Sequence, residues 1–502
     1  MGKPRCFDPL CGPFCGHPSG GFGQAFRPFF GVFEFLSEEK GMTEYDIFVI
    51  SDDVAGEKMA GPGIRAWELA KCLAKSFEVI LAVPDYSYKS SKNKELESCD
   101  FEVIDYSLSQ ADRIEDVGKK SRILIMQGYV LSKFPEIKSL SAHLICDLYV
   151  PFPLETLFIH QKKIPSIKDR EYMYLKDLNV YKDQLRHGDH FLCANIRQRD
   201  LFAGSLLCLN RINPRYLDHS TVLDQLISVV PFGISPDEPG ENRENTRDVL
   251  QKKFPGIQKD SVVFLWGGVI SNWFDPLTLI KAVQKAAAQN PKIKLLFLST
   301  QHANPLLPKL DMAQQAMELS DQLGLTDETV FFNHEWVDYS KRKDYFRAAD
   351  AGVSIHINHF ETYYSFRTRI LDYLKYELPI ICTQGDMFSE LAAEKNLGLT
   401  VGSEDEEELT RALVTLAEDA EKRQHMRERI QTEKKHFFWD RVSEPLVLYC
   451  QRVLSGQEPK KTVPVKKEKT KSLKRKSRSH FRTLFHQIPM KISSKIRRIF
   501  KF

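Results

Sequence analysis

The segment 359–374 concentrates the side chains that could carry out chemistry in this 502-residue chain. It holds two carboxylates, Glu361 and Asp372, and two guanidinium groups, Arg367 and Arg369. Guanidinium groups bind phosphate oxygens through paired N–H donors, and carboxylates accept hydrogen bonds from hydroxyl groups. The combination is therefore suited to a ligand that carries both a diphosphate and a sugar.

A helix is predicted to position these groups. Ser365 is a favourable N-cap, so we expect the helix to start after it and to offer the N–H groups of residues 366–368 to a diphosphate. Asp372 lies seven residues further on, about 10 Å along the axis at 1.5 Å per residue, which suits a ribose. Glu361, in the loop before the helix, would meet the group beyond the diphosphate. Alternatively, this is an ordinary surface helix in which Arg369 and Asp372 pair at i, i+3.

Short apolar runs that alternate with amphipathic stretches surround this segment. The runs are rich in Val, Ile and Leu, which is typical of parallel strands buried on both faces. The predicted strands are 46–51, 77–83, 122–127, 143–150, 190–194 and 226–231, then 262–266, 293–299, 330–333, 351–357, 379–383 and 397–401. The alternation predicts an α/β protein with two doubly wound, Rossmann-like domains that face each other across a cleft. Because such sheets bind ligands at the carboxyl ends of their strands, a site is expected directly after 351–357.

The composition divides the chain into five parts. They are a disordered leader (1–42, with Met42 as an alternative start), an N-terminal domain (43–234), a linker region (235–260), a C-terminal domain (261–455) and a basic tail (456–502). Cysteines in apolar surroundings favour a reduced, cytoplasmic protein. No cluster has convincing metal-ligand spacing, so neither a metal nor a cofactor is expected. No apolar run reaches 18 residues, so no spanning helix is expected.

Charge is concentrated at the C-terminal end of the chain. The formal net charge is +4, but Lys460–Phe502 contains 16 Lys and Arg and one acid, which gives +15 there and −11 elsewhere. Apolar residues in this tail recur at helical spacing, so that the pattern favours an amphipathic helix on an anionic membrane surface, here the inner face of the membrane. A solvated tail is an alternative. Nucleic-acid binding is less favoured, because phosphate binding needs no apolar stripe.

One glycine-containing turn and one aspartate in the first half of the chain carry weaker signals. Gly61-Pro62-Gly63 follows the first strand and opens a predicted helix, but it falls short of a glycine-rich phosphate loop, and a plain turn is an equal alternative. Asp147 ends a buried strand. It could orient a hydroxyl of a sugar or acceptor, or it could cap a local turn.

The chain resembles the group 1 retaining glycosyltransferases, which have the GT-B fold. Members carry an acidic residue, a helix start and a second acidic residue. Here these are Glu361 and Asp372, with ten residues between them rather than the usual seven. The insert 365–369 is similar to a subgroup associated with bacterial surface polysaccharides. Other similar stretches, spread over residues 45–450, are Cys146-Asp147-Leu148-Tyr149 with Pro151-Phe152 and Glu155, Arg197-Gln198-Arg199-Asp200, Pro231-Phe232-Gly233, Trp266-Gly267-Gly268 with Asn272-Trp273-Phe274-Asp275-Pro276, and Gln384-Gly385-Asp386.

The resemblance implies roles for most of these residues. Glu361 would hydrogen-bond the donor sugar and, with Asp147, take part in catalysis, and Asp372 would bind the ribose. Gly267 and Gly268 would let backbone N–H groups approach the phosphates.

Further residues would complete the two sides of the cleft. Ser365, Arg367 and Arg369 belong to the donor site, and the two arginines would replace a lysine that the family usually has. Gly61, Gly63 and Arg65 would face a phosphate or the acceptor from the first domain.

The expected activity is that of a retaining, metal-independent glycosyltransferase. It would move a sugar from a nucleotide diphosphate-sugar donor to a glycan or lipid-linked acceptor in surface polysaccharide biosynthesis. The leaving phosphate would help to remove the acceptor proton. One alternative is a GT-B-fold epimerase or hydrolase of nucleotide sugars. Another is a glycan-binding scaffold with a decayed site, against which the presence of Glu361 and Asp372 argues.

Overall fold

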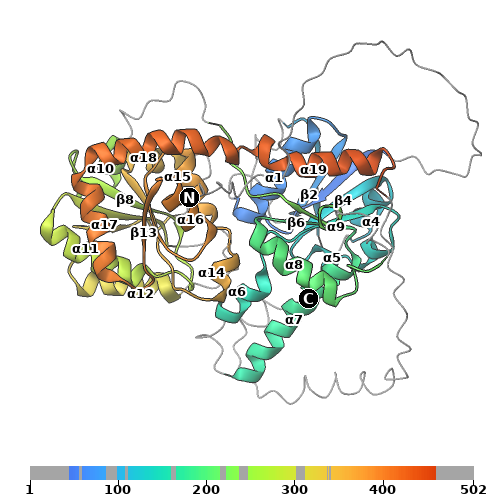
Figure 1. Ribbon diagram of the computed structural model, residues 1–502, viewed down its shortest axis with the longest axis horizontal. Helices are drawn as coiled ribbons and strands as arrows, with labels where there is room; N and C mark the ends of the chain where they lie inside the picture. The colour runs from blue at the N-terminus through green and yellow to red at the C-terminus, as the bar shows by residue number, and fades with distance from the viewer. Residues whose placement is uncertain are drawn as a thin grey trace, which may run out of the picture. The chain divides into compact units, whose positions relative to one another are not determined.

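Two parallel β-sheets, each covered by helices, make up the computed structural model of the protein (Figure 1). The structure describes residues 44–55, 59–85, 99–107, 111–159, 166–214, 222–236, 247–300, 311–335, 337 and 341–458. The predicted leader, its alternative start at Met42 and the basic tail from residue 459 onwards lie outside the described residues. The expected α/β class with two doubly wound, Rossmann-like domains is confirmed.

The first sheet has the strand order β3-β2-β1-β4-β5-β6-β7 and is parallel throughout. Its strands are β1 (Tyr45–Ile50), β2 (Val79–Pro84), β3 (Glu102–Tyr106), β4 (Ser121–Gln127), β5 (His143–Asp147), β6 (His190–Cys193) and β7 (Ile227–Val229). Its helices are α1 (Gly61–Ala74), α4 (Ala111–Lys119), α5 (Val130–Lys133), α6 (Phe152–Ile159), α7 (Ile167–His187), α8 (Ile196–Cys208) and α9 (Val222–Leu226). We call this unit the first lobe.

The second sheet, of the second lobe, has the order β10-β9-β8-β11-β12-β13 and is also parallel. Its strands are β8 (Val262–Val269), β9 (Ile293–Ser299), β10 (Val330–Phe332), β11 (Ala351–Ser354), β12 (Ile380–Thr383) and β13 (Gly398–Val401). Its helices are α10 (Arg247–Lys253), α11 (Pro276–Gln289), α12 (Asp311–Gln322), α13 (Arg342–Ala348), α14 (Phe360–Tyr364), α15 (Thr368–Lys375), α16 (Met387–Glu394), α17 (Glu406–Glu418) and α18 (Ala420–Glu433).

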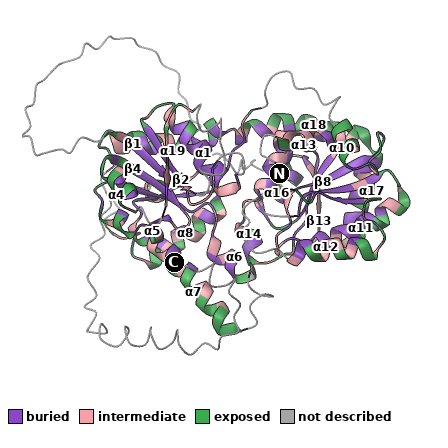
Figure 2. Ribbon diagram, turned by 180° about the vertical axis from the view of Figure 1, so that it is seen from behind, coloured by how far each residue is buried: buried purple, intermediate pink, exposed green. Residues whose placement is uncertain are grey.

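Apolar side chains explain why these elements form layers. The central strands are buried in both lobes, whereas the outer faces of the helices are exposed (Figure 2). Capping residues set several helix starts. For example, the side chain of Asn195 accepts from the N–H of Gln198 at the start of α8, and Asp275 accepts from the N–H of Thr278 at the start of α11. These capping bonds fix where the helices begin, and thereby hold the loops at the carboxyl ends of the strands in place.

The connections between the lobes differ from the predicted boundaries. Part of the predicted linker 235–260 is folded, since α10 buries Leu250 and packs against α13. The last helix, α19 (Trp439–Leu454), was assigned to the second domain, but it packs against α1 and the first sheet. The chain crosses back beside its first crossing, where the N–H of Ile234 donates to Phe437 O at 2.8 Å and the N–H of Trp439 donates to Ile234 O at 3.1 Å.

Candidate functional site

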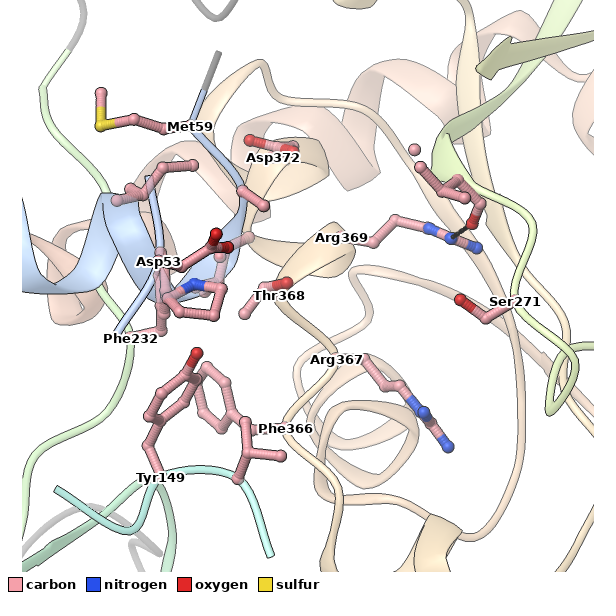
Figure 3. Close-up of a pocket in the computed structure, with 18 of the residues that line it drawn as sticks. Asp53, Met59, Tyr149, Phe232, Ser271, Phe366, Arg367, Thr368, Arg369 and Asp372 are labelled. Atoms are coloured by element: carbon pink, nitrogen blue, oxygen red, sulfur yellow. Dashed lines mark hydrogen bonds between the residues drawn. The ribbon is translucent and has the colours of Figure 1, made fainter. Parts of the chain in front are cut away.

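A cavity of about 770 Å³ is lined by residues of both lobes. On the first lobe it is lined by the loops that follow β1, β4 and β5 and by the start of α1. On the second lobe it is lined by the end of β8, the start of α15 and the end of β11. Figure 3 shows the side chains of Asp53 and Tyr149 on the first lobe and those of Arg367 and Arg369 on the second. The predicted ligand position at the carboxyl ends of the strands therefore coincides with a real cavity.

The second-lobe wall of this cavity is cationic. Four basic residues line it, Arg342, Arg367, Arg369 and Lys375, and the acid Asp372 is the single carboxylate among the described residues of that wall. Such a wall is complementary to a ligand with several negative charges.

Arg369 is a buried cation of this wall whose hydrogen-bond donors are only partly used. The residue is 9% exposed, its Nη2 donates to Val269 O at 2.8 Å, and its guanidinium carbon lies 4.3 Å from the ring centroid of Trp266 and 4.2 Å from that of Phe274. Its Nε and Nη1 atoms have no hydrogen-bond partner among the described residues. Burial lowers the pKa of Arg369 to about 10, so the group is charged at neutral pH. A buried cation with two unused donors is costly, and an anionic ligand would remove that cost.

The start of the helix lies further along the chain than predicted. Helix α15 begins at Thr368, and Arg367 is its N-cap residue. Ser365 instead ends α14, is 5% exposed, and donates its hydroxyl to Thr362 O at 2.9 Å. The predicted N-cap at Ser365 is therefore wrong. Because Ser365 does not line the cavity either, its predicted place in the donor site finds no support.

Glu361 lies behind Arg367, away from the cavity surface. It is 2% exposed and does not line the cavity, and its Oε2 accepts from Arg367 Nη2 at 2.8 Å. His359 Nδ1 lies 3.7 Å from the same oxygen. Burial lowers the pKa of His359, although Glu361 acts in the opposite direction. The carboxylate thus orients Arg367, which does line the cavity, and its direct contact with a donor sugar stays a prediction.

A second carboxylate supports Arg367 from the other side. Asp386 Oδ2 lies 4.0 Å from Arg367 Nε and 3.5 Å from Nε2 of the fully buried His356. Burial alone would raise the pKa of Asp386, but His356 and Arg367 together hold it below its usual value. Arg367 is thereby fixed between two acids.

Asp372 lines the cavity, as its predicted role requires, but it is not free. Its Oδ2 accepts from Arg342 Nη2 at 2.8 Å. Arg342 lies 30 residues away at the start of α13, and it could not be predicted as a site residue because no local pattern links it to Asp372. The pair places one cation and one hydrogen-bond acceptor side by side at this end of the cavity.

The two glycines at the end of β8 differ in their roles. The N–H of Gly267 donates to Tyr373 Oη at 2.9 Å, and a Cβ there would lie 2.7 Å from Phe346. Gly267 therefore allows close packing, and its N–H is not available to a phosphate. Gly268 has φ +142°, where side chains are rare, and a Cβ there would lie 3.7 Å from Nε of Arg369. Gly268 keeps the space beside that guanidinium open.

Arg65 and Asp147 are bound to each other. Arg65 Nε lies 2.6 Å from Asp147 Oδ2 and Nη2 lies 2.9 Å from Oδ1, while Nη1 and Nη2 also donate to the carbonyls of Pro231 and Val230. Arg65 is 0% exposed and does not line the cavity. The prediction that Arg65 faces a ligand is wrong. Asp147 does line the cavity, but because both of its oxygens are occupied, it supports the loop after β5 and does not act as a free base.

The glycines of α1 also separate into two roles. Gly61 is the first residue of α1 and lines the cavity, as predicted for this side. Gly63 does not line the cavity, and a Cβ atom at this position would lie 1.7 Å from Val54 O. Gly63 is therefore required because α1 approaches the loop after β1 closely.

Contacts of α8 hold the two lobes together beside the site. Gln198 Nε2 donates to Tyr364 O at 2.8 Å and to Tyr149 O at 3.0 Å. Arg197 Nη1 donates to the carbonyls of Tyr363 and Gly385, both at 3.1 Å. In the sequence, Arg197 and Gln198 stand out only through the resemblance, whereas in the structure their side chains fix the segment that leads to Arg367.

These two doubly wound sheets, with a cavity lined by the carboxyl ends of both, define the GT-B class of fold. The computed structure is similar to crystal structures of Anabaena HepE in complex with UDP-glucose (TM-score 0.56, 14% identity) and of a glycosyltransferase from Rickettsia africae (TM-score 0.54, 14% identity). Each comparison covers 82% of this chain and 99% of the other. WaaG, a glycosyltransferase involved in lipopolysaccharide biosynthesis, is similar at TM-score 0.55 and 13% identity, over 82% of this chain and 100% of that chain.

A family model gives a more specific similarity for the second lobe. Residues 249–433 match the family described as glycosyl transferases group 1, in agreement with the resemblance of the segment around Glu361 and Asp372. A comparison with curated proteins finds no match. Within the described residues, no group of His, Cys, Asp or Glu could hold a metal ion, and no helix is long and apolar enough to cross a membrane.

Proposed function

We propose that the protein is a glycosyltransferase that moves a sugar from a nucleotide diphosphate-sugar to a glycan or lipid-linked acceptor. The observation that carries this proposal is the guanidinium of Arg369, which is buried beside Gly268 at the start of α15 with two unpartnered donors. The family match of the second lobe supports the proposal, as does the HepE structure, which holds UDP-glucose in a similar fold.

The chemistry needs negative charge to be stabilised on the leaving diphosphate. When the bond between the anomeric carbon and the phosphate oxygen breaks, the electron pair stays on the diphosphate. Arg369, Arg367 and the first N–H groups of α15 can bind that charge without help from a metal ion. Asp372, at the same wall, is in a position to accept hydrogen bonds from the ribose. In this proposal the configuration of the sugar is retained, as the resemblance to the retaining family implies.

The proposed setting is the cytoplasmic face of a membrane, where a surface polysaccharide is built. The basic, amphipathic pattern of residues 460–502 supports this setting, since such a segment binds anionic lipids. A protein held there would meet a lipid-linked or growing glycan acceptor.

A nucleotide panel tests the proposal directly. Thermal shift with UDP, GDP, ADP and the corresponding diphosphate-sugars should show stabilisation by at least one nucleotide in the wild-type protein. Arg369→Gln should abolish the shift, whereas Arg429→Gln, which removes an exposed arginine of α18, should leave it unchanged. Product analysis with the nucleotide sugar that binds then separates transfer from its alternatives. An epimerised or free sugar formed without need of an acceptor would contradict transfer, and no shift with any nucleotide would contradict the donor site itself.

A further inference from the structure

The first-lobe wall of the cavity carries a side-chain hydroxyl that the protein itself does not use. Among the described residues of that wall, two have a hydroxyl group, Tyr129 and Tyr149. Tyr129 Oη donates to Asp177 Oδ1 at 2.7 Å. The hydroxyl of Tyr149 has no hydrogen-bond partner among the described residues, although the residue is only 7% exposed. Because buried tyrosine hydroxyls usually have a partner, we expect a ligand to supply it.

Three contacts hold Tyr149 in place. Its ring packs against Phe232, with ring centroids 6.3 Å apart, and the guanidinium carbon of Arg65 lies 4.8 Å from the ring centroid of Tyr149. The carbonyl of Tyr149 accepts from Gln198 Nε2 at 3.0 Å. Arg65 is itself fixed by its ion pair with Asp147. The hydroxyl is therefore presented to the cavity by a side chain that is packed in a defined position.

This hydroxyl lies beside the start of α1. A Cβ atom at Gly61, the first residue of that helix, would lie 3.9 Å from Tyr149 Oη. The N-cap residue Ala60 has no side-chain acceptor, and the first turn holds no acidic residue. The N–H of Gly61 makes no hydrogen bond inside the helix, and Pro62 has no N–H. The O–H of Tyr149 and the N–H of Gly61 are thus two hydrogen-bond donors side by side at the positive end of a helix.

The two hydrogen-bond donors belong to the wall opposite α15. Figure 3 shows the Tyr149 side chain extending into the cavity, with its hydroxyl directed towards the space beside Thr368. Thr368 is the first residue of α15. The cavity is therefore lined by the starts of two helices, α1 from the first lobe and α15 from the second, and each offers N–H groups to a ligand.

The rest of the first-lobe wall is acidic. No Lys, Arg or His lines it among the described residues of that lobe, whereas four carboxylates do, those of Asp52, Asp53, Asp147 and Glu155. Asp147 is held by Arg65, and Asp52 accepts from Lys133 Nζ at 2.6 Å. Burial raises the pKa of Glu155 to about 7, so its negative charge is reduced at neutral pH. Tyr149 is therefore the side chain of this wall that is best suited to bind an anionic group.

The proton of Tyr149 stays on its oxygen. Burial raises the pKa of this hydroxyl well above its usual value, and Asp147 acts in the same direction, while Arg65 opposes it. At neutral pH the hydroxyl is therefore a hydrogen-bond donor, and it does not act as a base.

We propose that the Tyr149 hydroxyl, together with the N–H of Gly61, binds an oxygen of the phosphate that carries the donor sugar and stabilises the charge that develops there when the diphosphate leaves. This inference rests on the proposed glycosyltransferase function and adds a first-lobe contact to the diphosphate bound by Arg369. When the bond between the anomeric carbon and the phosphate oxygen breaks, the electron pair stays on that oxygen, and the Tyr149 proton stays on the phenol. The contact is a hydrogen bond and is compatible with retention of configuration.

A phosphate oxygen fits this position better than a sugar hydroxyl. Two adjacent hydrogen-bond donors at a helix start favour an anionic oxygen, which has lone pairs and no proton of its own. Hydrogen bonds to a charged oxygen are also stronger than those to a neutral one.

Calorimetric titration of Tyr149→Phe with a nucleoside mono- and diphosphate tests the inference, with the base that the nucleotide panel selects. The diphosphate contains the phosphate in question, and the monophosphate lacks it. The variant should bind the diphosphate at least about tenfold more weakly, as expected for loss of a hydrogen bond to a charged group, and bind the monophosphate as wild type does. Tyr172→Phe, which changes an exposed tyrosine on α7, is the matched control and should change neither affinity.

Stability and turnover complete the test. Because the Tyr149 hydroxyl has no partner within the described residues, the ligand-free Tyr149→Phe protein should melt at the wild-type temperature or above it. Its kcat for transfer should fall at least about tenfold, since one hydrogen bond to the leaving phosphate is lost. Wild-type diphosphate affinity and kcat in Tyr149→Phe would overturn the inference, as would a loss confined to the KM of the acceptor. Failure of every nucleotide to bind the wild-type protein would instead remove the function on which the inference rests.

Discussion

Arg65 and Asp147 form a two-point ion pair in the interior of the first lobe, with Nε to Oδ2 at 2.6 Å and Nη2 to Oδ1 at 2.9 Å. The side chains are 0% and 4% exposed, and 82 residues separate them in the sequence. The pair links α1 to the end of β5 and, through the carbonyls of Val230 and Pro231, to the segment that leaves β7. It therefore ties together three segments that shape the first-lobe wall.

Breaking this pair from one side should destabilise the protein strongly. Asp147→Asn leaves a buried guanidinium without its counter-ion, for which we expect a cost of about 3–5 kcal/mol, visible as a lower melting temperature. The double variant Arg65→Met/Asp147→Leu removes both charges and should recover most of the loss. Asp105→Asn, which breaks a partly exposed pair with Arg113, is the control and should cost less than about 1 kcal/mol. Equal stability of Asp147→Asn and wild type would show that the pair does not hold these segments.

Asp372 should contribute to donor binding more than to turnover. Asp372→Ala removes the acceptor proposed for the ribose and frees Arg342, so that KM for the donor should rise about tenfold or more while kcat changes little. Asp372→Asn keeps the shape and separates the effect of charge from that of volume. Glu418→Ala, at an exposed site on α17, serves as the control. A large fall in kcat with unchanged KM would contradict this assignment.

Glu361 should act on turnover through Arg367. Glu361→Ala removes the carboxylate 2.8 Å from Arg367 Nη2, so the guanidinium loses one of the two acids that fix it. We expect kcat to fall about 100-fold, as for loss of one positioned charge at a developing anion. Glu361→Gln keeps a hydrogen-bond acceptor and should retain part of the activity. Wild-type transfer by the purified Glu361→Ala protein would refute the role.

The raised pKa of Glu155 also predicts a pH-dependent stability. A carboxyl whose folded pKa of about 7 exceeds its unfolded value near 4.5 carries no penalty when it is protonated at low pH. The folded state loses stability as the pH rises from about 4.5 to about 7, and the loss is complete above that range. Glu155→Gln should therefore match wild type near pH 4 and be more stable at pH 8, by about 1–2 kcal/mol once water in the cavity is allowed for. Melting temperatures that differ by a constant amount across this range would contradict it.

The basic tail should bind anionic membranes. Sedimentation with vesicles of phosphatidylglycerol and phosphatidylcholine should bring down the full chain, and a chain ending at Glu458 should stay in the supernatant. Raising the salt concentration should weaken binding, because about 1 kcal/mol per basic residue is electrostatic. Pure phosphatidylcholine vesicles are the control. Equal sedimentation of both chains would show that the tail is not the anchor.

Much of the fold could be predicted because buried parallel strands leave continuous apolar runs in the sequence. Strand β3 was missed for the opposite reason, since Glu102–Tyr106 alternates between exposed and buried residues at the sheet edge. The segment with Arg367, Arg369 and Asp372 could be found because local spacing carries the signal. The predicted N-cap at Ser365 was wrong because a serine that can start one helix can equally stand at the end of the preceding helix.

The parts of the site that depend on distant residues could not be predicted. Arg342 pairs with Asp372 across 30 residues, and Arg65 pairs with Asp147 across 82. Tertiary contacts decide whether a charged side chain faces a ligand or pairs with another residue of the protein. These contacts cannot be read from the spacing of residues in the sequence. The polarity of the cavity, with acids on one wall and bases on the other, likewise exists only after the two lobes have folded.

The chain passes between the two lobes twice, at Ile234 and at Phe438, and these two crossings lie side by side. Their position limits how the lobes can move apart to open the cavity. Both covalent links between the sheets pass through one small ladder, in which Ile234 is bonded on either side to Phe437 and Trp439. A swing of one sheet relative to the other can therefore take place about this hinge without breaking either sheet. Such a swing would break the bonds of Arg197 and Gln198 to the segment 363–385 and the bond from Asn195 Nδ2 to Ser365 O, so we expect these side-chain bonds to oppose opening of the cavity.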